Sequence, residues 1–233
     1  MASAFVFPGG AAEPDEDAAT TAARELFEEA GILLARGPAG DPDARAALRK
    51  RILGGAPAAT ALAEAGLAWA TESLVAWSHW ITPSIEPKRF SAQFFVCDLP
   101  EGQQPKFDDI ETVDQRWVTP RDALAQAKEL ALPPPQIRTC WELAEHETID
   151  DVLAAARGRA AEPLPIMPRL RLMDAEAAPC LLLPWDPEYV AGGTGDSAPL
   201  VYQPRWACGP SRFVMEDQTW KHVLAPGSTI AGS

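Results

Sequence analysis

Three glutamates, Glu25, Glu28 and Glu29, stand close together near the start of this 233-residue sequence. On an α-helix, where successive residues turn by about 100°, their side chains fall within roughly one third of the circumference. Carboxylates at this spacing repel each other by about 0.2–0.5 kcal/mol per pair, so helix stability alone does not favour the arrangement. A divalent cation bound between them would offset the repulsion. Because carboxylate oxygens are hard ligands, the cluster predicts Mg²⁺ or Mn²⁺ acting on a substrate that carries phosphates.

An isolated E-x-x-E-E run is also common on solvated helix faces, but here the run belongs to a longer spaced pattern. The fixed positions of that pattern are Gly10, Glu16, Arg24, Glu25, Leu26, Glu28, Glu29, Gly31 and Ile32. They fill every position of the Nudix box, G-x5-E-x7-R-E-U-x-E-E-x-G-U, in which U is a bulky aliphatic residue. The sequence therefore resembles the Nudix hydrolases.

This resemblance implies an α/β fold, the Nudix α/β/α sandwich with a mixed sheet. It also implies hydrolysis of a nucleoside diphosphate linked to another moiety, with Mg²⁺ or Mn²⁺ as the cofactor. The partner is then a small-molecule nucleoside diphosphate derivative. In such a reaction the metal neutralises the diphosphate and lowers the pKa of a bound water, so no serine or cysteine nucleophile is required.

The resemblance also implies roles for individual box residues. The expected metal ligands are Glu25, Glu28, Glu29 and the backbone carbonyl of Gly10, or of its neighbour Gly9. The expected catalytic residues are Glu25, Glu28 and Arg24. Among these, Glu25 is either a ligand or the base that deprotonates water, and Arg24 orients a glutamate. Glu16 is expected to brace the loop, with a second metal ion as the alternative contact.

Two later segments are similar to the Nudix branch that contains the coenzyme A and acyl-CoA diphosphatases. They are HWITPSIEPKRFSAQFFVCDLPEGQ at 79–103 and DDIETVDQRWVTPRDALAQA at 108–127. In this branch Arg89 would contact a substrate phosphate and Glu111 would add a carboxylate. The alternative is an ordinary surface position for Arg89 and a solvated turn for Glu111.

The elements that must position these residues follow from local patterns. An apolar run at Ala4–Phe7 predicts a strand that enters the Pro8-Gly9-Gly10 turn, and an alanine-rich helix then ends before Gly31. Residues 36–70 have helical spacing and predict an inserted helical segment, as is common in that branch. Residues 73–83, 89–100 and 112–120 predict strands whose Trp77, Trp80 and Trp117 lie in the core. Helices are predicted after Thr119, at 136–146 and at 148–157.

We expect a Nudix domain at residues 1–160 and a proline- and glycine-rich extension of irregular strands and loops at 161–233. Nudix domains normally place at least one strand before the glycine turn, whereas nine residues precede Gly10 here. Three interpretations are open. In the first, the start of the chain is shortened. In the second, strands from 163–233, or from a second subunit in a homodimer, fill the vacant sheet position. In the third, the activity has been lost.

The composition excludes several partners. A formal charge of −13 disfavours nucleic acids and anionic membranes, and no apolar run reaches membrane-spanning length. The four cysteines are widely spaced and predict free, buried thiols in a cytoplasmic protein. The alternative to an enzyme is a catalytically impaired Nudix-fold protein that binds a ligand or regulates another protein.

Overall fold

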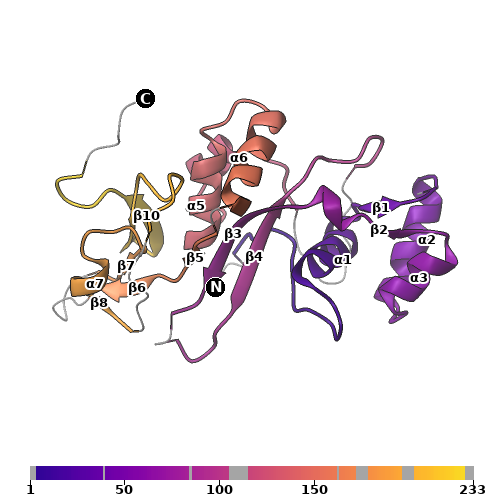
Figure 1. Cartoon of the computed structure of the whole chain (residues 1–233), viewed down its shortest axis with the longest axis horizontal. Helices are drawn as coiled ribbons and strands as arrows, with labels where there is room; N and C mark the ends of the chain where they lie inside the picture. Colours follow the sequence, from indigo (N-terminus) through magenta and orange to yellow (C-terminus); the bar gives the residue numbers. More distant parts are fainter. Residues whose placement is uncertain are drawn as a thin grey trace. The chain divides into compact units, whose positions relative to one another are not determined.

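The computed structural model describes residues 4–38, 40–83, 86–104, 115–161, 163–171, 178–195 and 202–228. The chain divides into two compact units, each assembled from separated segments. One, called here the box unit, comprises Phe7–Val75 and Phe95–Trp117. The other, called the sheet unit, comprises Met1–Val6, Ala76–Phe94 and Val118–Ser233. Figure 1 shows the chain and labels most of its helices and strands.

Helix α1 (Ala18–Ala30) carries most of the box residues, and local signals fix both of its ends. Asp17 is the N-cap, and its Oδ1 accepts a hydrogen bond of 2.7 Å from the backbone N–H of Thr20. Gly31 is the C-cap in the left-handed region, with φ of 71°, and its N–H donates to Phe27 O at 3.0 Å. The helix therefore ends where the sequence predicts.

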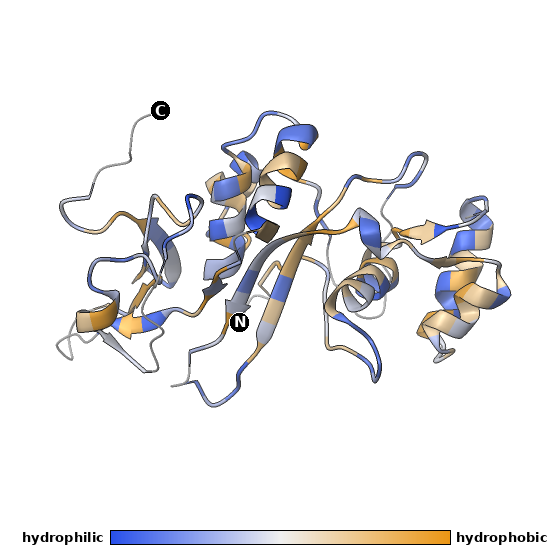
Figure 2. Cartoon of the chain, in the orientation of Figure 1, coloured by the Kyte–Doolittle hydropathy of each residue, from blue (hydrophilic) through white to orange (hydrophobic). Residues whose placement is uncertain are grey.

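The predicted helical insertion is confirmed, and it is closed by a two-stranded ribbon. Strand β1 (Ala35–Arg36) pairs antiparallel with β2 (Ala68–Trp69), in the register Ala35↔Trp69 and Arg36↔Ala68. Between them lie α2 (Pro42–Leu53) and α3 (Ala58–Glu64), and the short 3-10 helix η1 (Thr71–Ser73) follows. Both inserted helices carry hydrophobic and hydrophilic residues (Figure 2). Their buried side chains form one cluster with residues of α1 and the segments beside it: Phe27, Leu33, Leu48, Ile52, Ala58, Ala61, Leu62 and Leu67.

The sheet unit contains a three-stranded sheet in the order β4-β3-β5. Its strands are β3 (Val75–Ile81), β4 (Ser91–Val96) and β5 (Pro165–Ile166). Strand β5 runs parallel to β3, with His79 opposite Pro165 and Trp80 opposite Ile166. A segment beyond residue 160 thus adds a strand to the sheet of β3. The helices of this unit are α4 (Pro120–Ala125), α5 (Pro134–Leu143) and α6 (Ile149–Ala161).

A second sheet, of five strands, occupies the C-terminal part of the sheet unit in the order β10-β9-β7-β6-β8. Its strands are β6 (Arg169–Arg171), β7 (Cys180–Leu182), β8 (Gly193–Thr194), β9 (Arg212–Glu216) and β10 (Thr219–Val223). Adjacent strands are antiparallel, and the short helix α7 (Tyr189–Gly192) precedes β8. Short strands separated by loops are what the sequence predicts for this region, whereas the division at residue 160 stays a prediction.

A buried charged cluster joins the helices of the sheet unit to its C-terminal segment. Glu142 accepts hydrogen bonds of 2.7 Å from Arg138, 2.7 Å from Arg159 and 2.9 Å from the indole N–H of Trp77. Arg138 also donates to Pro210 O at 3.0 Å. Each guanidinium lies over tryptophan rings, with Arg159 3.9 Å from the centre of the Trp77 ring. These contacts make residues after 200 part of the unit's core.

Three expectations about the chain need correction. The run Ala4–Phe7 is not a strand; Phe5 instead donates its N–H to Leu130 O at 3.0 Å and packs on the core. Residues 115–119, the described part of the third expected strand, have no strand structure. Trp77 and Trp80 are buried as predicted, but Trp117 is 68% exposed. An α/β chain with parallel and antiparallel strand pairs is confirmed.

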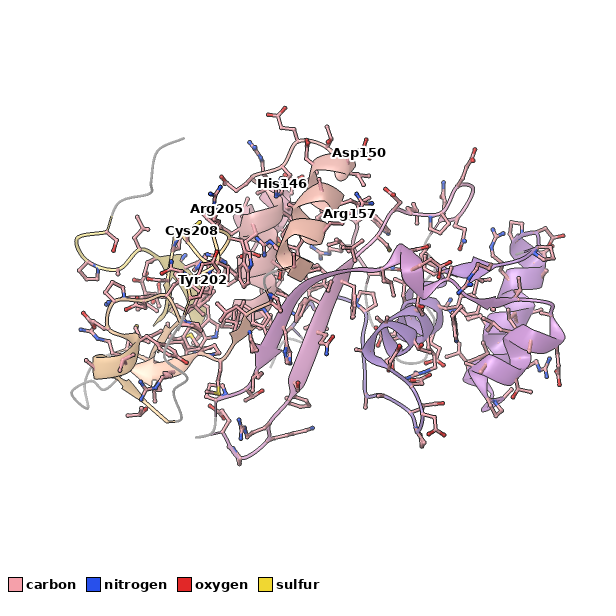
Figure 3. All side chains as sticks on the ribbon, in the orientation of Figure 1. His146, Asp150, Arg157, Tyr202, Arg205 and Cys208 are labelled. Atoms are coloured by element: carbon pink, nitrogen blue, oxygen red, sulfur yellow. The ribbon has the colours of Figure 1, made fainter. Side chains whose placement is uncertain are left out.

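All four cysteines are unpaired, as predicted, but they are not all buried. Cys140 and Cys180 lie in the core, Cys97 is partly exposed, and Cys208 is exposed in the loop before β9 (Figure 3). None of the helices in the described ranges has the length and apolar character needed to cross a membrane.

Candidate active site

Arg24 is the centre of a hydrogen-bond network in the box unit, and its side chain is only 5% exposed. Its Nε and Nη2 donate to the two oxygens of Glu16, at 2.9 and 3.0 Å. Its Nη1 donates to Glu25 Oε1 at 2.8 Å and to Glu28 Oε2 at 2.9 Å. Nη2 also donates to the backbone carbonyl of Ala11 at 2.9 Å. One planar guanidinium therefore fixes three carboxylates and the loop before the helix.

Helix spacing brings one pair of this network together. Arg24 and Glu28 are four residues apart on α1, and side chains at that separation lie on the same helix face. Glu16 immediately precedes the N-cap, and its Oε2 also accepts hydrogen bonds from the N–H of Glu13 at 3.1 Å and from the hydroxyl of Thr21 at 3.1 Å. The loop before α1 is thus tied to the helix through Glu16.

The glycine turn lies against the carboxylate face of α1. The N–H of Gly9 donates to Glu29 Oε2 at 3.0 Å. A Cβ atom at Gly10 would lie 2.6 Å from Cδ and 2.8 Å from Oε2 of Glu25, which is closer than real Cβ contacts allow. A side chain at position 10 would therefore displace the Glu25 carboxylate. Gly10 is needed for close approach and not for its backbone angle.

The carboxylates outnumber the cation that binds them. Glu16, Glu25 and Glu28 share the single guanidinium of Arg24, so three negative charges face one positive charge. Partial burial raises the pKa of Glu28, and the nearby charges of Glu25 and Glu13 raise it further, although Arg24 opposes the change. An excess of negative charge in a partly buried site favours an additional cation.

The charge balance differs at Glu16 and Arg24. Burial alone would raise the pKa of Glu16, but its hydrogen bonds from Arg24 and from the Glu13 N–H lower it overall. Burial alone would lower the pKa of Arg24, but its hydrogen bonds to Glu16 and Glu25 raise it overall. Arg24 therefore stays charged and Glu16 stays ionised, which is the state that the observed pairing requires.

Two polar residues that contact this region were missed in the sequence. Arg49 of α2 donates to the backbone carbonyls of Glu28 and Glu29, at distances of 2.6–2.9 Å. Gln103 is buried, and its amide makes two hydrogen bonds of 2.8 Å with the N–H and C=O of Leu33, just after α1. Neither belongs to the box, and both are distant in sequence from their partners. The single local signal is the basic run of α2.

Five of the predicted site residues lie in one unit, and a sixth belongs to the other. Arg24, Glu25, Glu28, Glu29 and Gly10 all lie in the box unit. Arg89 lies in the sheet unit, where it is exposed and its Nε donates to Thr82 O at 3.2 Å. Glu111 falls outside the described residues.

Among the described residues, no three His, Cys, Asp or Glu side chains converge in a way that could hold a metal ion. The reason is visible in the contacts. Glu25 and Glu28 are turned toward Nη1 of Arg24, whereas Glu29 is turned toward Gly9.

Comparisons with known proteins indicate a Nudix domain, as the box does. The family model described as the NUDT19 Nudix domain matches residues 14–143, more than half of the chain. The human protein "Acyl-coenzyme A diphosphatase NUDT19" is 33% identical over 191 residues, which cover 72% of this chain and 50% of that protein. The Caenorhabditis elegans "Putative nudix hydrolase 7" is 27% identical over 175 residues, which cover 70% of this chain and 57% of that protein. The chain thus spans about half the length of these relatives.

One solved structure is also similar. It is the crystal structure of a Nudix hydrolase from Alicyclobacillus acidocaldarius, with 28% sequence identity and a TM-score of 0.49, covering 63% of this chain and 70% of that one. The family match includes Glu16 and the whole of α1, with Arg24 and the three glutamates of the box. Because this family model matches residues 14–143, the chain belongs to the family of NUDT19 Nudix domains.

Proposed function

We propose that this protein is a metal-dependent Nudix hydrolase that cleaves a diphosphate linkage in a small nucleoside diphosphate derivative. The observation that carries the proposal is the Arg24 network, in which one buried guanidinium holds Glu16, Glu25 and Glu28 beside the glycine turn. Coenzyme A and acyl-CoA are the first candidate substrates, because the human relative is named an acyl-coenzyme A diphosphatase. Free thiols at all four cysteines support a reducing compartment such as the cytoplasm.

The donor set suits a hard divalent cation such as Mg²⁺ or Mn²⁺. Glu25, Glu28 and Glu29 would supply carboxylate oxygens, and Gly10 would supply its carbonyl. The missing side chain at Gly10 lets the Glu25 carboxylate lie directly against the turn, and the site has an excess of negative charge. When bound, the metal would neutralise the diphosphate and make a nucleophile of water at neutral pH.

The protein's own groups would orient the reactants and move the proton. Arg24 would keep Glu25 and Glu28 next to each other by binding one oxygen of each, so their second oxygens would be offered to the metal once Glu29 turns from Gly9 toward it. Glu25 or Glu28 would take the proton from the attacking water. A general base works best when its pKa lies close to the working pH, and burial raises the pKa of Glu28 in that direction. Arg89 is proposed to contact a substrate phosphate.

A substrate screen with active-site variants tests this function. The protein should hydrolyse coenzyme A or an acyl-CoA in the presence of Mg²⁺ or Mn²⁺ and lose activity on treatment with a chelator. Glu28→Gln and Glu29→Gln should each lower kcat by about 10²–10⁴-fold while the circular dichroism spectrum is unchanged. Glu72→Gln is a suitable control, because Glu72 is an exposed glutamate of the box unit paired with Arg36.

Full activity in both glutamine variants would exclude the catalytic assignment. Tight nucleotide binding by calorimetry, without hydrolysis of any tested diphosphate, would instead favour a ligand-binding or regulatory protein. Hydrolysis of nucleotide sugars or dinucleoside polyphosphates in preference to coenzyme A would keep the diphosphatase function but change its substrate.

A further inference from the structure

The C-terminal end of α1 is held by an arginine from the helical insertion. Arg49 of α2 donates from Nε to Glu28 O at 2.9 Å, and from Nη2 to Glu28 O at 2.6 Å and Glu29 O at 2.8 Å. These are backbone carbonyls of two residues whose side chains carry the candidate metal ligands. The contact therefore joins the insertion to the Nudix box itself.

These carbonyls need partners from outside the helix. The last four carbonyls of an α-helix have no intrahelical N–H partner, and α1 ends at Ala30. Phe27 O is paired with the N–H of Gly31 at 3.0 Å, and Arg49 serves the next two carbonyls. A cation at this position also interacts favourably with the negative end of the helix dipole. Arg49 thus satisfies the part of α1 that would fray most readily.

Packing fixes Arg49 in place. Leu48 and Ile52, which precede and follow Arg49 on α2, are buried in the same hydrophobic cluster as Phe27 of α1. The guanidinium is therefore anchored to α2 on a rigid surface that already contacts α1. An exposed side chain on a loose loop would not hold two carbonyls in a fixed position.

We propose that Arg49 is a positioning residue through which the inserted helices fix the backbone that carries Glu28 and Glu29, the candidate metal ligands. This inference rests on the proposed function. Without Arg49, the last turn of α1 can open, and the Cα–Cβ bonds of Glu28 and Glu29 turn with their backbone. The insertion would then act on the metal site only through the backbone of α1, without contacting the metal or the substrate.

The test compares three variants of the full chain. Arg49→Met removes the hydrogen-bond donors and keeps the apolar stem, and Arg49→Lys keeps the charge with fewer donors. Arg51→Met is the matched control, because Arg51 lies on the same helix and pairs with Glu64 within the insertion. The measurements are Mn²⁺ affinity from the electron paramagnetic resonance signal of the free ion, kcat and KM with coenzyme A, and the melting temperature.

Arg49→Met should weaken Mn²⁺ binding by about tenfold, the lower end of the effect of residues that orient metal ligands. We expect a fall in kcat with little change in KM, partial recovery in Arg49→Lys, and wild-type Mn²⁺ affinity in Arg51→Met. If Arg49→Met melts at a lower temperature but binds Mn²⁺ as tightly as the wild type, Arg49 is only a structural cap and the proposal is wrong. If the wild type itself does not bind Mn²⁺, the proposed function fails, and the positioning role fails with it.

Discussion

Gly10 lies so close to Glu25 that a Cβ atom at position 10 would come within 2.8 Å of Glu25 Oε2. Gly10→Ala should therefore push the Glu25 carboxylate out of its place beside Arg24. A displacement of about 1 Å in a catalytic group can cost about 10²-fold in rate, and we expect a loss of that order in kcat. Steady-state kinetics with coenzyme A and Mn²⁺ would measure it.

The neighbouring glycine provides the control. A Cβ atom at Gly9 would meet nothing within 4 Å, and its N–H, which binds Glu29, is kept in alanine. Gly9→Ala should thus retain nearly wild-type activity. Equal losses in the two variants would mean that the turn is sensitive to any side chain, and that the contact with Glu25 has no special role.

Arg24 is expected to contribute to stability as well as to catalysis. Arg24→Met removes five hydrogen bonds and leaves Glu16, Glu25 and Glu28 without their shared cation. Breaking a buried ion pair by removing one partner costs about 3–5 kcal/mol, and the partial exposure of these glutamates places the expected loss near the lower value. Urea denaturation followed by circular dichroism would give the change in the free energy of unfolding.

An exposed arginine of the same unit is the comparison for Arg24. Arg36 pairs with Glu72, and both side chains are more than half exposed, at 66% and 57%. Arg36→Met should change the free energy of unfolding by less than about 1 kcal/mol, as is usual for surface ion pairs. A similar small effect in Arg24→Met would show that the network does not stabilise the box unit.

Gln103 should stabilise the chain segment that follows α1. Gln103→Leu preserves the size of the side chain but leaves the N–H and C=O of Leu33 buried without their present partner. An unsatisfied buried backbone group costs about 1–3 kcal/mol, so we expect a loss of at least about 2 kcal/mol in the free energy of unfolding. The adjacent Gln104 is exposed, and Gln104→Leu should have an effect within about 0.5 kcal/mol.

The sheet unit should lose stability in mild acid because of His222. Burial lowers the pKa of His222 to about 3, with the charge of Arg138 acting in the same direction. Below pH 6.5 the unfolded chain binds a proton at this histidine and the folded protein does not, so stability is present above 6.5 and is lost as the pH falls toward 3. Through this histidine, the free energy of unfolding falls by about 2 kcal/mol between pH 7 and pH 5.

Replacement of His222 isolates this effect. The ring stacks on Phe213 with centroids 4.5 Å apart, so His222→Phe keeps an aromatic ring there and removes the titrating group. Its free energy of unfolding should fall less between pH 7 and pH 5 than that of the wild type. An unchanged slope in His222→Phe would contradict the prediction.

The parts of this protein that could be predicted from the sequence are those set by nearby residues. The ends of α1 follow from Asp17 and Gly31, and the common face of the three glutamates follows from their spacing. Helical spacing alone predicted the insertion. The Arg24 network was predictable only through the resemblance to a known box, because spacing does not specify which carboxylates a guanidinium will contact.

The contacts that the sequence did not predict join segments that are far apart in the chain. Gln103 and Leu33 are 70 residues apart, and Arg49 reaches Glu28 only because α2 folds back on α1. Local propensity carries no information on such approaches. The apolar run at Ala4–Phe7 fails as a predicted strand for a related reason, since an apolar residue such as Phe5 can also bury its side chain without pairing its backbone in a sheet.

Since Ala35 lies opposite Trp69 and Arg36 opposite Ala68, residues 37–67 leave the β1–β2 ribbon and return to it at the same end. A tight turn joining Arg36 directly to Ala68 would leave the path of the flanking chain unaltered. Over evolutionary time this segment can therefore grow or shrink without shifting what comes before or after it. A shortened descendant would still need a new apolar cover for Phe27 and new donors for the carbonyls of Glu28 and Glu29.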